Sequence, residues 1–245
     1  MTCPGTTCAP SPYESGRLSL GDSQSIRPGG LKLTARAIAL ANLPSGATVL
    51  DLGCGAGDTT LWLSAQGFRT IGIDCATAPA MPAIDGPGAW TRVVGLAEAL
   101  PFEDHSFDAI LAECSFSLFD DRARALAECA RVLVDGGRLI ISDLYARQPN
   151  AIAEVRTIGA PCVAGIWVRE ELESSLSCAG FVVDAWEDHS RALRECAARL
   201  LFEHGSLDGL WGCHGATLAA TQSAMRAARA GYFLLIATRR RREKG

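Results

Sequence analysis

Short apolar runs alternate with amphipathic stretches along most of this chain. Residues 48–52 contain Val49, Leu50 and Leu52, a run of the kind that a parallel sheet buries on both faces. Helical periodicity follows at residues 59–66, and the same alternation returns several times further along. Six more strands are predicted at residues 69–73, 91–95, 106–112, 138–142, 181–186 and 231–238. Strands that alternate with helices predict an α/β fold.

The first predicted strand runs directly into a glycine-rich turn. Gly53, Gly55 and Gly57 let the backbone turn tightly and let a ligand approach without meeting a Cβ. The helix that follows offers free N–H groups to the occupant of the turn. Asp51 lies within the motif, and Asp74 ends the second predicted strand about 20 residues after the glycines, where an acid can accept from both ribose hydroxyls. A nucleotide-like ligand is therefore expected, with a ligand-free structural turn as the alternative.

Two motifs carry a resemblance to a known family. The sequence V-L-D-L-G-C-G-A-G, followed by I-G-I-D, resembles the class I S-adenosylmethionine (SAM)-dependent methyltransferases of the type 11 and ubiquinone/menaquinone kind. A second match, R-V-L-x-x-G-G-x-L-x-x-S-D, runs from Arg131 to Asp143. The resemblance covers about residues 47–145. It implies a Rossmann-like seven-stranded sheet, mostly parallel with an antiparallel last strand and helices on both faces, and SAM as the cofactor.

The resemblance also assigns cofactor contacts. The glycines would hold the methionine end, Asp51 would help place the amino group, and Asp74 would hold the ribose. Cys54, within the glycine motif, and Cys75, directly after Asp74, are also expected to contact the cofactor. Residues 95–102 resemble the family's adenine segment, G-D-A-x-x-L-P-F, but Leu96 stands where the family commonly has an acid that accepts from the adenine amino group. Either the backbone of Ala97 alone holds the adenine, or Glu98 supplies the missing acceptor.

Methyl transfer needs little beyond alignment of nucleophile, carbon and sulfur, although an oxygen, nitrogen or carbon nucleophile can also require a base. Glu113 ends the fourth predicted strand at the edge where ligands bind in such sheets, so it is a candidate for both catalysis and cofactor binding. His189 follows two acids, Glu187 and Asp188, that could orient or charge it. A surface-loop histidine is the alternative interpretation. The remaining candidate bases are Asp143, Tyr145, His204 and His214.

A local likeness suggests an alternative substrate. Pro161-Cys162-Val163-Ala164-Gly165 resembles the C-x-x-G segment of arsenite methyltransferases, in which the cysteine is a thiolate ligand of arsenic. Soft thiolates suit a soft metalloid. Bound arsenic carries its own lone pair, so its methylation requires no base. Cys162 would then be one ligand of the substrate. Simple packing of Cys162 before the next helix is the alternative.

Composition narrows the class of protein. The chain has 245 residues, 48% of them apolar and 20% charged, with a formal net charge of −4 and a pI near 5.6, which disfavours a nucleic-acid-binding surface. The sequence contains no apolar run of membrane-spanning length and no secretory signal pattern, so we expect a cytoplasmic protein. Ten cysteines form no C-x-x-C pair, which disfavours a zinc ribbon, and Cys129 and Cys178 are expected on buried helix faces.

The chain is expected to form one main domain with an N-terminal segment and a helical insertion. Residues 1–46 are predicted to be an arm and a helix, and residues 47–245 to be the methyltransferase domain. The resemblance implies that the helix lies over the cofactor as a lid, and a helix that only covers the edge of the sheet is the alternative. An insertion at about residues 189–230, with helical runs at 191–203 and 217–230, is expected to cover the substrate pocket because it is long for a plain connection. The predicted function is methylation of a small molecule, with a thiol-bound metalloid or a catalytically inactive SAM-binding module as the alternatives.

Overall fold

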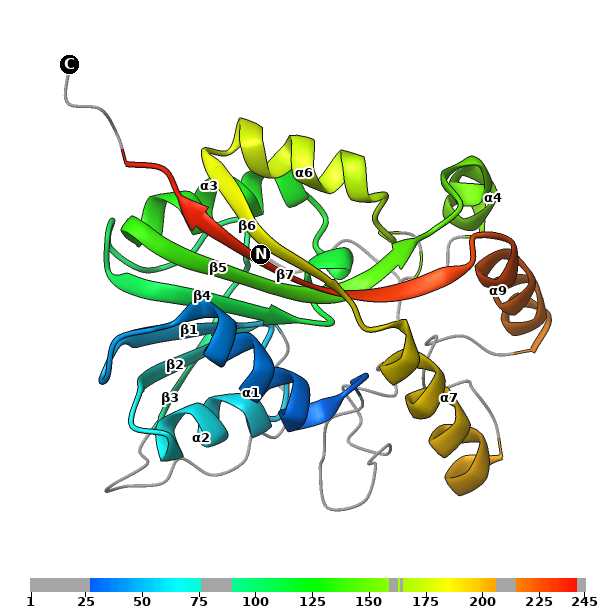
Figure 1. Cartoon of the computed structure of the whole chain (residues 1–245), viewed down its shortest axis with the longest axis horizontal. Helices are drawn as coiled ribbons and strands as arrows, with labels where there is room; N and C mark the ends of the chain where they lie inside the picture. Colours follow the sequence, from blue (N-terminus) through cyan, green and yellow to red (C-terminus); the bar gives the residue numbers. More distant parts are fainter. Residues whose placement is uncertain (1–26, 76–89, 159–162, 164, 206–214, 242–245) are drawn as a thin grey trace.

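A computed structural model describes residues 27–75, 90–158, 163, 165–205 and 215–241 (Figure 1). Its centre is a seven-stranded sheet of order β3-β2-β1-β4-β5-β7-β6. All neighbouring pairs are parallel except those of β7, which runs antiparallel to both β5 and β6. The predicted sheet, with its antiparallel last strand, is therefore confirmed. The strands are β1 Thr48–Leu52, β2 Arg69–Asp74, β3 Thr91–Val94, β4 Phe107–Glu113, β5 Leu133–Ala146, β6 Phe181–Asp188 and β7 Ala230–Arg239.

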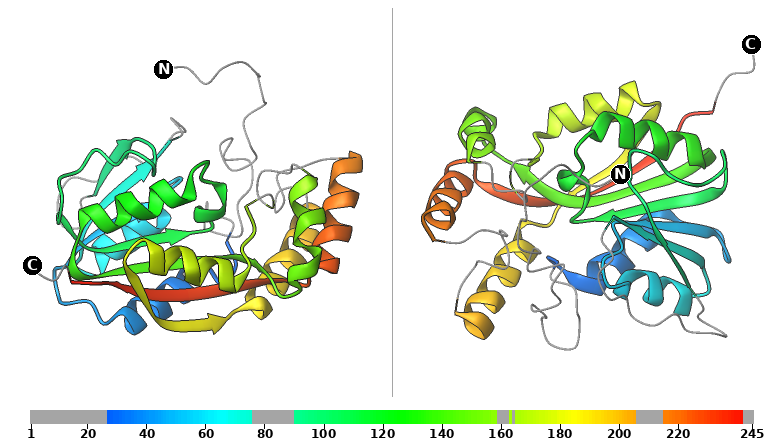
Figure 2. Two further views of the ribbon diagram at one scale, coloured as in Figure 1. Left: turned by 90° about the horizontal axis from the view of Figure 1, so that it is seen from above. Right: turned by 180° about the vertical axis from the view of Figure 1, so that it is seen from behind.

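Helices cover both faces of the sheet. In Figure 1, α3 and α6 lie above it and α1 and α2 below, while α4 and α9 pack side by side beyond one end (Figures 1 and 2). The helices are α1 Gly30–Ala41, α2 Asp58–Ala65, α3 Arg122–Val132, α4 Ile152–Thr157, α6 Arg169–Cys178, α7 Ser190–His204 and α9 Gly215–Ala227, with short 3-10 turns at Phe116–Leu118 and Pro149–Ala151.

Two apolar cores follow from the alternation of side chains along each strand. In β1, Val49 packs with α1, α2 and α7, whereas Leu50 and Leu52 pack with α3 and α6 on the other face. Asp51 shares the face of Val49 and therefore points toward α2. The strand pattern thus decides on which side of the sheet the acid of the glycine motif lies.

Two details differ from the sequence prediction, the start of β5 and the exposure of Cys178. Strand β5 begins at Leu133, directly after α3 and five residues earlier than expected. The strand therefore includes the two glycines that were expected to precede it. Gly136 has a φ of +80°, and the pairing of β5 with β4 shifts register at this point.

Cys178 is exposed, which contradicts its predicted packing. The buried positions of α6 are Leu172 and Leu176, and a residue two positions after Leu176 points to the opposite side of the helix. Cys129, whose neighbours Ala125, Leu126 and Val132 are buried, is fully buried as predicted.

Candidate cofactor-binding site

The glycine turn joins β1 to α2 at the carboxyl edge of the sheet. Gly53 and Gly57 have φ values of +80° and +98°, where L side chains are strained. Both also lack space, since a Cβ would lie 2.4 Å from the Cβ of Ser115 at Gly53 and 2.6 Å from the Trp90 ring at Gly57. At Gly55, which also has positive φ, a Cβ would meet no atom of the described chain within 4 Å. Gly53 and Gly57 therefore shape the turn, and Gly55 is its open point.

Asp74 binds the same turn from the end of β2. Its Oδ2 atom accepts a hydrogen bond of 2.8 Å from the backbone N–H of Gly55. This hydrogen bond joins the ends of β1 and β2 and places a carboxylate beside Gly55, where the turn has free space. The acid predicted to hold the ribose lies at the glycine turn, and its role stays a prediction.

Asp51 is buried behind the turn, with a relative exposure of 3%. The Thr60 hydroxyl donates to its Oδ2 at 2.6 Å, which fastens the first turn of α2 to β1. Burial raises the pKa of the Asp51 carboxyl to about 7, against the opposing effect of the Thr60 hydrogen bond. The structure therefore gives Asp51 a role in holding α2, beside its predicted role toward the amino group. Cys54 is buried too, with its Sγ against Gly72.

Glu113 at the end of β4 is held by three side chains. The hydroxyls of Thr34 on α1 and Thr59 on α2 each donate to one of its oxygens at 2.8 Å. Arg27 forms an ion pair with it, with 3.2 Å between Nε and Oε2, and also donates from Nη2 to Thr34. Glu113 thus connects the segment before α1 with the helix after the glycine turn. A carboxylate so engaged is better suited to binding a cation than to removing a proton.

The adenine segment lies beyond β3. The side chain of Leu96 is 56% exposed and Ala97 is buried. Glu98 is turned toward the start of α3, where its carboxylate accepts from the backbone N–H of Asp121 at 3.3 Å. Cys75, after β2, is exposed. Glu98 therefore has a structural partner of its own, which favours the backbone of Ala97 as the adenine contact.

His189 lies further along the same edge. Strand register aligns Glu113, Ser142, Leu234 and Glu187 in one row across β4, β5, β7 and β6, so Glu113 and Glu187 lie roughly 14 Å apart by three strand spacings. His189 Nε2 is 2.9 Å from Glu187 Oε2, and Arg36 of α1 donates to both oxygens of Glu187, from Nη2 to Oε1 and from Nε to Oε2. The structure orients His189 with a carboxylate, as predicted from the sequence, but does not bring it together with Glu113.

The other candidate bases have structural partners or lie elsewhere. Asp143 is buried and accepts from the N–H and hydroxyl of Ser117 and from the N–H of Leu144, while burial raises its pKa to about 6. Tyr145 donates to Asp188 at 3.1 Å. His204 ends α7 and is exposed. His214 and Cys162 lie outside the described residues, so the metalloid alternative stays a prediction.

Residues missed by sequence reasoning surround Glu113. Arg27, Thr34 and Thr59 come from three separate segments, and no local pattern marks them as a group. Tyr232 was missed as well. Its buried hydroxyl is 2.9 Å from the sulfur of Cys114, which follows Glu113 in the left-handed conformation with φ +52°. A β-branched or bulky residue could not easily replace Cys114 there. Strained backbone of this kind clusters at functional sites, so it supports a binding site at this edge of the sheet.

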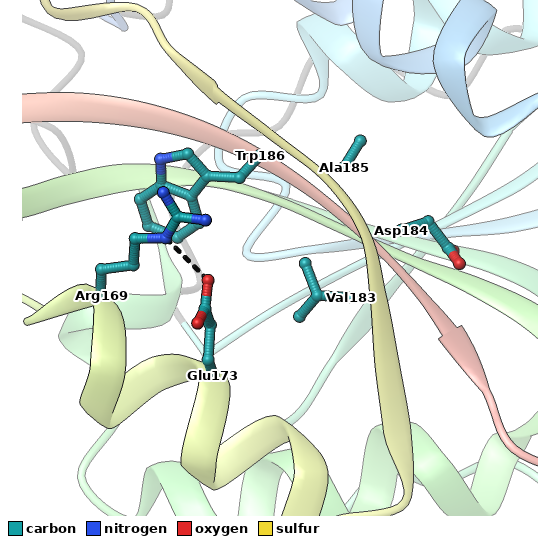
Figure 3. A pocket seen from close by; sticks show the side chains of 6 residues that line it. All are labelled: Arg169, Glu173, Val183, Asp184, Ala185 and Trp186. Carbon is teal, nitrogen blue, oxygen red and sulfur yellow. Dashed lines mark hydrogen bonds and ion pairs between the residues drawn. The ribbon is translucent and has the colours of Figure 1, made fainter.

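Two cavities among the described residues lie away from this site. One of about 350 Å³ lies between α6 and the edge strand β6, lined by Val183, Asp184 and Ala185 and by Arg169, which stacks over Trp186 (Figure 3). The other, of about 310 Å³, lies near the start of α3. Neither contains a predicted site residue.

Among the described helices, none is long and apolar enough to cross a membrane. The described acids, cysteines and histidines form no group that could hold a metal ion.

Comparison with known proteins agrees with this geometry. The crystal structure of the [4+2]-cyclase SpnF aligns with a TM-score of 0.69 and 26% identity over 92% of this chain and 84% of that chain. Haemonchus contortus phosphoethanolamine N-methyltransferase 2, solved with S-adenosyl-L-methionine, aligns with a TM-score of 0.67 and 16% identity over 89% of this chain and 54% of that chain. The chain has the fold of the class I methyltransferases.

Sequence comparison is narrower and more specific. Residues 50–141 match the family model described as a methyltransferase domain. The demethylmenaquinone methyltransferase of Thermus thermophilus is 39% identical over 119 residues, which are 45% of this chain and 53% of that protein. The chain spans about half the length of the curated relatives it matches. Residues 50–141 are therefore similar to a methyltransferase domain, and the fold that holds them is that of the class I methyltransferases.

Proposed function

We propose that this protein binds SAM at the glycine turn and transfers its methyl group to a small molecule. The observation that carries the proposal is the carboxyl edge itself, where Asp74 joins the open Gly55 and where Glu113 lies beside the first turn of α2. SAM, when bound, supplies a methyl group on a positively charged sulfur. The carboxylates of Asp74 and Glu113 at this edge fit a cofactor that carries net positive charge.

Each residue has a distinct proposed role. Gly53, Gly55 and Gly57 hold the methionine end by backbone contact, Asp74 accepts from the ribose, and Glu113 with Asp51 neutralises the amino group. Ala97 holds the adenine by its backbone, beside Leu96 and Cys75. Alignment of these groups with the acceptor is the main contribution to the rate.

His189 is the proposed base for an acceptor that must lose a proton. Its ring is 2.9 Å from the Glu187 carboxylate, which orients it. We further propose that α7 and α9, which lie between β6 and β7 in the chain, cover the acceptor pocket. Such a cover suits a small molecule, and the demethylmenaquinone methyltransferase likeness makes a quinol or phenol the first acceptor class to test.

Cofactor binding is tested by calorimetric titration with S-adenosylhomocysteine (SAH), which retains every proposed contact except the methyl group. We expect Asp74→Asn to weaken SAH binding by about 10- to 100-fold, because a hydrogen bond to a charged group is lost while the side chain keeps an oxygen for Gly55. Glu103→Gln, a change at an exposed acid, is the matched control. Equal affinities for the wild type and Asp74→Asn would remove Asp74 from the site.

Turnover is tested by incubation with SAM and a panel of quinols, phenols, carboxylic acids and amines, with SAH detected by mass spectrometry. His189→Gln should lower kcat and leave SAH affinity unchanged. A second candidate function is SAM binding without methyl transfer, favoured by the likeness to a protein named as a cyclase and by Leu96 in place of the family's acid. SAH binding with no SAH formation from any acceptor would support that second candidate.

A further inference from the structure

The segment before α1 places a positive charge inside the candidate site. The side chains of Arg27 and Glu113 are only 8% and 5% exposed, and their Nε and Oε2 atoms are 3.2 Å apart. Removing two charges from water costs several kcal/mol per ion before their attraction is counted. Each of these two buried charges therefore needs an opposite charge as its partner in every state of the folded protein.

The position of the pair relates it to the amino-acid end of the cofactor. Thr59, which binds the same oxygen of Glu113, is in the first turn of α2, two residues after Gly57. Thr34 of α1 binds the other oxygen and also accepts from Arg27. The Arg27 guanidinium thus lies between α1 and the end of the glycine turn, where the methionine end is proposed to bind.

The amino-acid end of SAM carries a carboxylate and an ammonium group on one carbon, which are the charges of the Arg27–Glu113 pair in reverse. We propose that Arg27 binds this carboxylate, and that Glu113 exchanges its contact with Arg27 for one with the ammonium group. The exchange replaces one buried ion pair with two and leaves no charge unpaired. A guanidinium suits the role because its donors match the two oxygens of a carboxylate. This inference rests on the proposed function, since it names a ligand contact within the same site.

The test varies the ligand and the protein together. Arg27→Met is titrated with SAH, with its analogue that lacks only the carboxylate, and with 5′-methylthioadenosine, which lacks the whole amino-acid end. We expect Arg27→Met to weaken SAH binding by about 10- to 100-fold, the range for a charge-assisted hydrogen bond. Affinities for the other two ligands should change less than threefold.

Controls separate this contact from a structural effect. Arg36→Met removes another arginine that binds α1 to the sheet edge, and it should leave all three affinities unchanged. Arg27→Lys keeps the charge and should lose less SAH affinity than Arg27→Met; it also replaces that variant if Met fails to fold. If Arg27→Met weakens all three ligands equally, Arg27 acts only through the shape of the site and the inference is wrong. Failure of the wild type to bind SAH would instead overturn the proposed function.

Discussion

Two ion pairs connect the N-terminal part of the chain to the carboxyl edge of the sheet, and they differ in burial more than in chemistry. Arg27 and Glu113 are 8% and 5% exposed, whereas Arg36 and Glu187 are 51% and 28% exposed. The exposed pair has the shorter contact, 2.5 Å against 3.2 Å. Water solvates and screens an exposed pair, so its geometry alone says little about its energy. Burial determines which of the two pairs the fold depends on.

The largest expected effect is at the buried pair. Glu113→Ala leaves the Arg27 guanidinium buried without this carboxylate, and breaking a buried pair in this way costs about 3–5 kcal/mol of unfolding free energy. Glu187→Ala, the matched change at the exposed pair, should cost about 1 kcal/mol or less. Urea unfolding followed by circular dichroism measures both. Similar losses for the two variants would contradict the assignment of the buried pair.

An effect of intermediate size is expected at Asp51, which is buried behind the glycine turn. Here the unfolding free energy should depend on pH. Its pKa is raised by burial to about 7 in the folded protein, against 3.8 for an ordinary carboxyl. Between about pH 4 and pH 7 the folded protein keeps a proton that the unfolded chain has released, so the unfolding free energy falls as pH rises through this window.

Asp51→Asn should therefore flatten the fall and make the variant more stable than the wild type at pH 8. Asp143, whose pKa burial raises to about 6, remains in the variant and leaves part of the slope. Unfolding free energies at several values of pH between 4 and 8 test this. An unchanged slope in Asp51→Asn would show that Asp51 is ionised throughout. Asp184→Asn, at an exposed carboxylate, is the control.

The smallest expected effect is at the exposed pair. Arg36→Ala should lower the unfolding free energy by less than either change above, and 1 M salt should remove most of that difference because the Debye length falls to about 3 Å. Denaturation at low and high salt measures it. A loss that persists at 1 M salt would show that the aliphatic part of Arg36, and not its charge, supports α1.

Local pattern explains why much of the sheet could be predicted from the sequence. Strands β1, β2 and β4 are apolar runs bounded by turn residues, and the glycine turn is read from the spacing of Gly53, Gly55 and Gly57. The orientation of His189 by Glu187 was also predicted, because the two residues are neighbours in the chain.

Contacts that depend on distant segments could not be predicted in this way. Arg27 and Thr34 bind Glu113 across 86 and 79 positions, and nothing near them in the chain indicates that partner. Asp143 has the sequence context of an exposed strand end, yet Ser117 covers it. Cys178 was misplaced because an apolar neighbour in sequence, Ala179, does not determine the face of the helix that is buried.

The contacts of α1 also affect the order in which the protein can be assembled on the ribosome. Thr34 leaves the ribosome 79 residues before Glu113, and Arg36 leaves 151 residues before Glu187. At 5–20 residues per second, the second interval is roughly 8 to 30 s. Until β1, β4 and β5 have been made, the apolar side of the helix, with Leu33 and Ala37, has no sheet to cover it, and its contacts with β7 form last. During synthesis the contacts of the first helix with the sheet are therefore completed only when β7, the last strand, has been made.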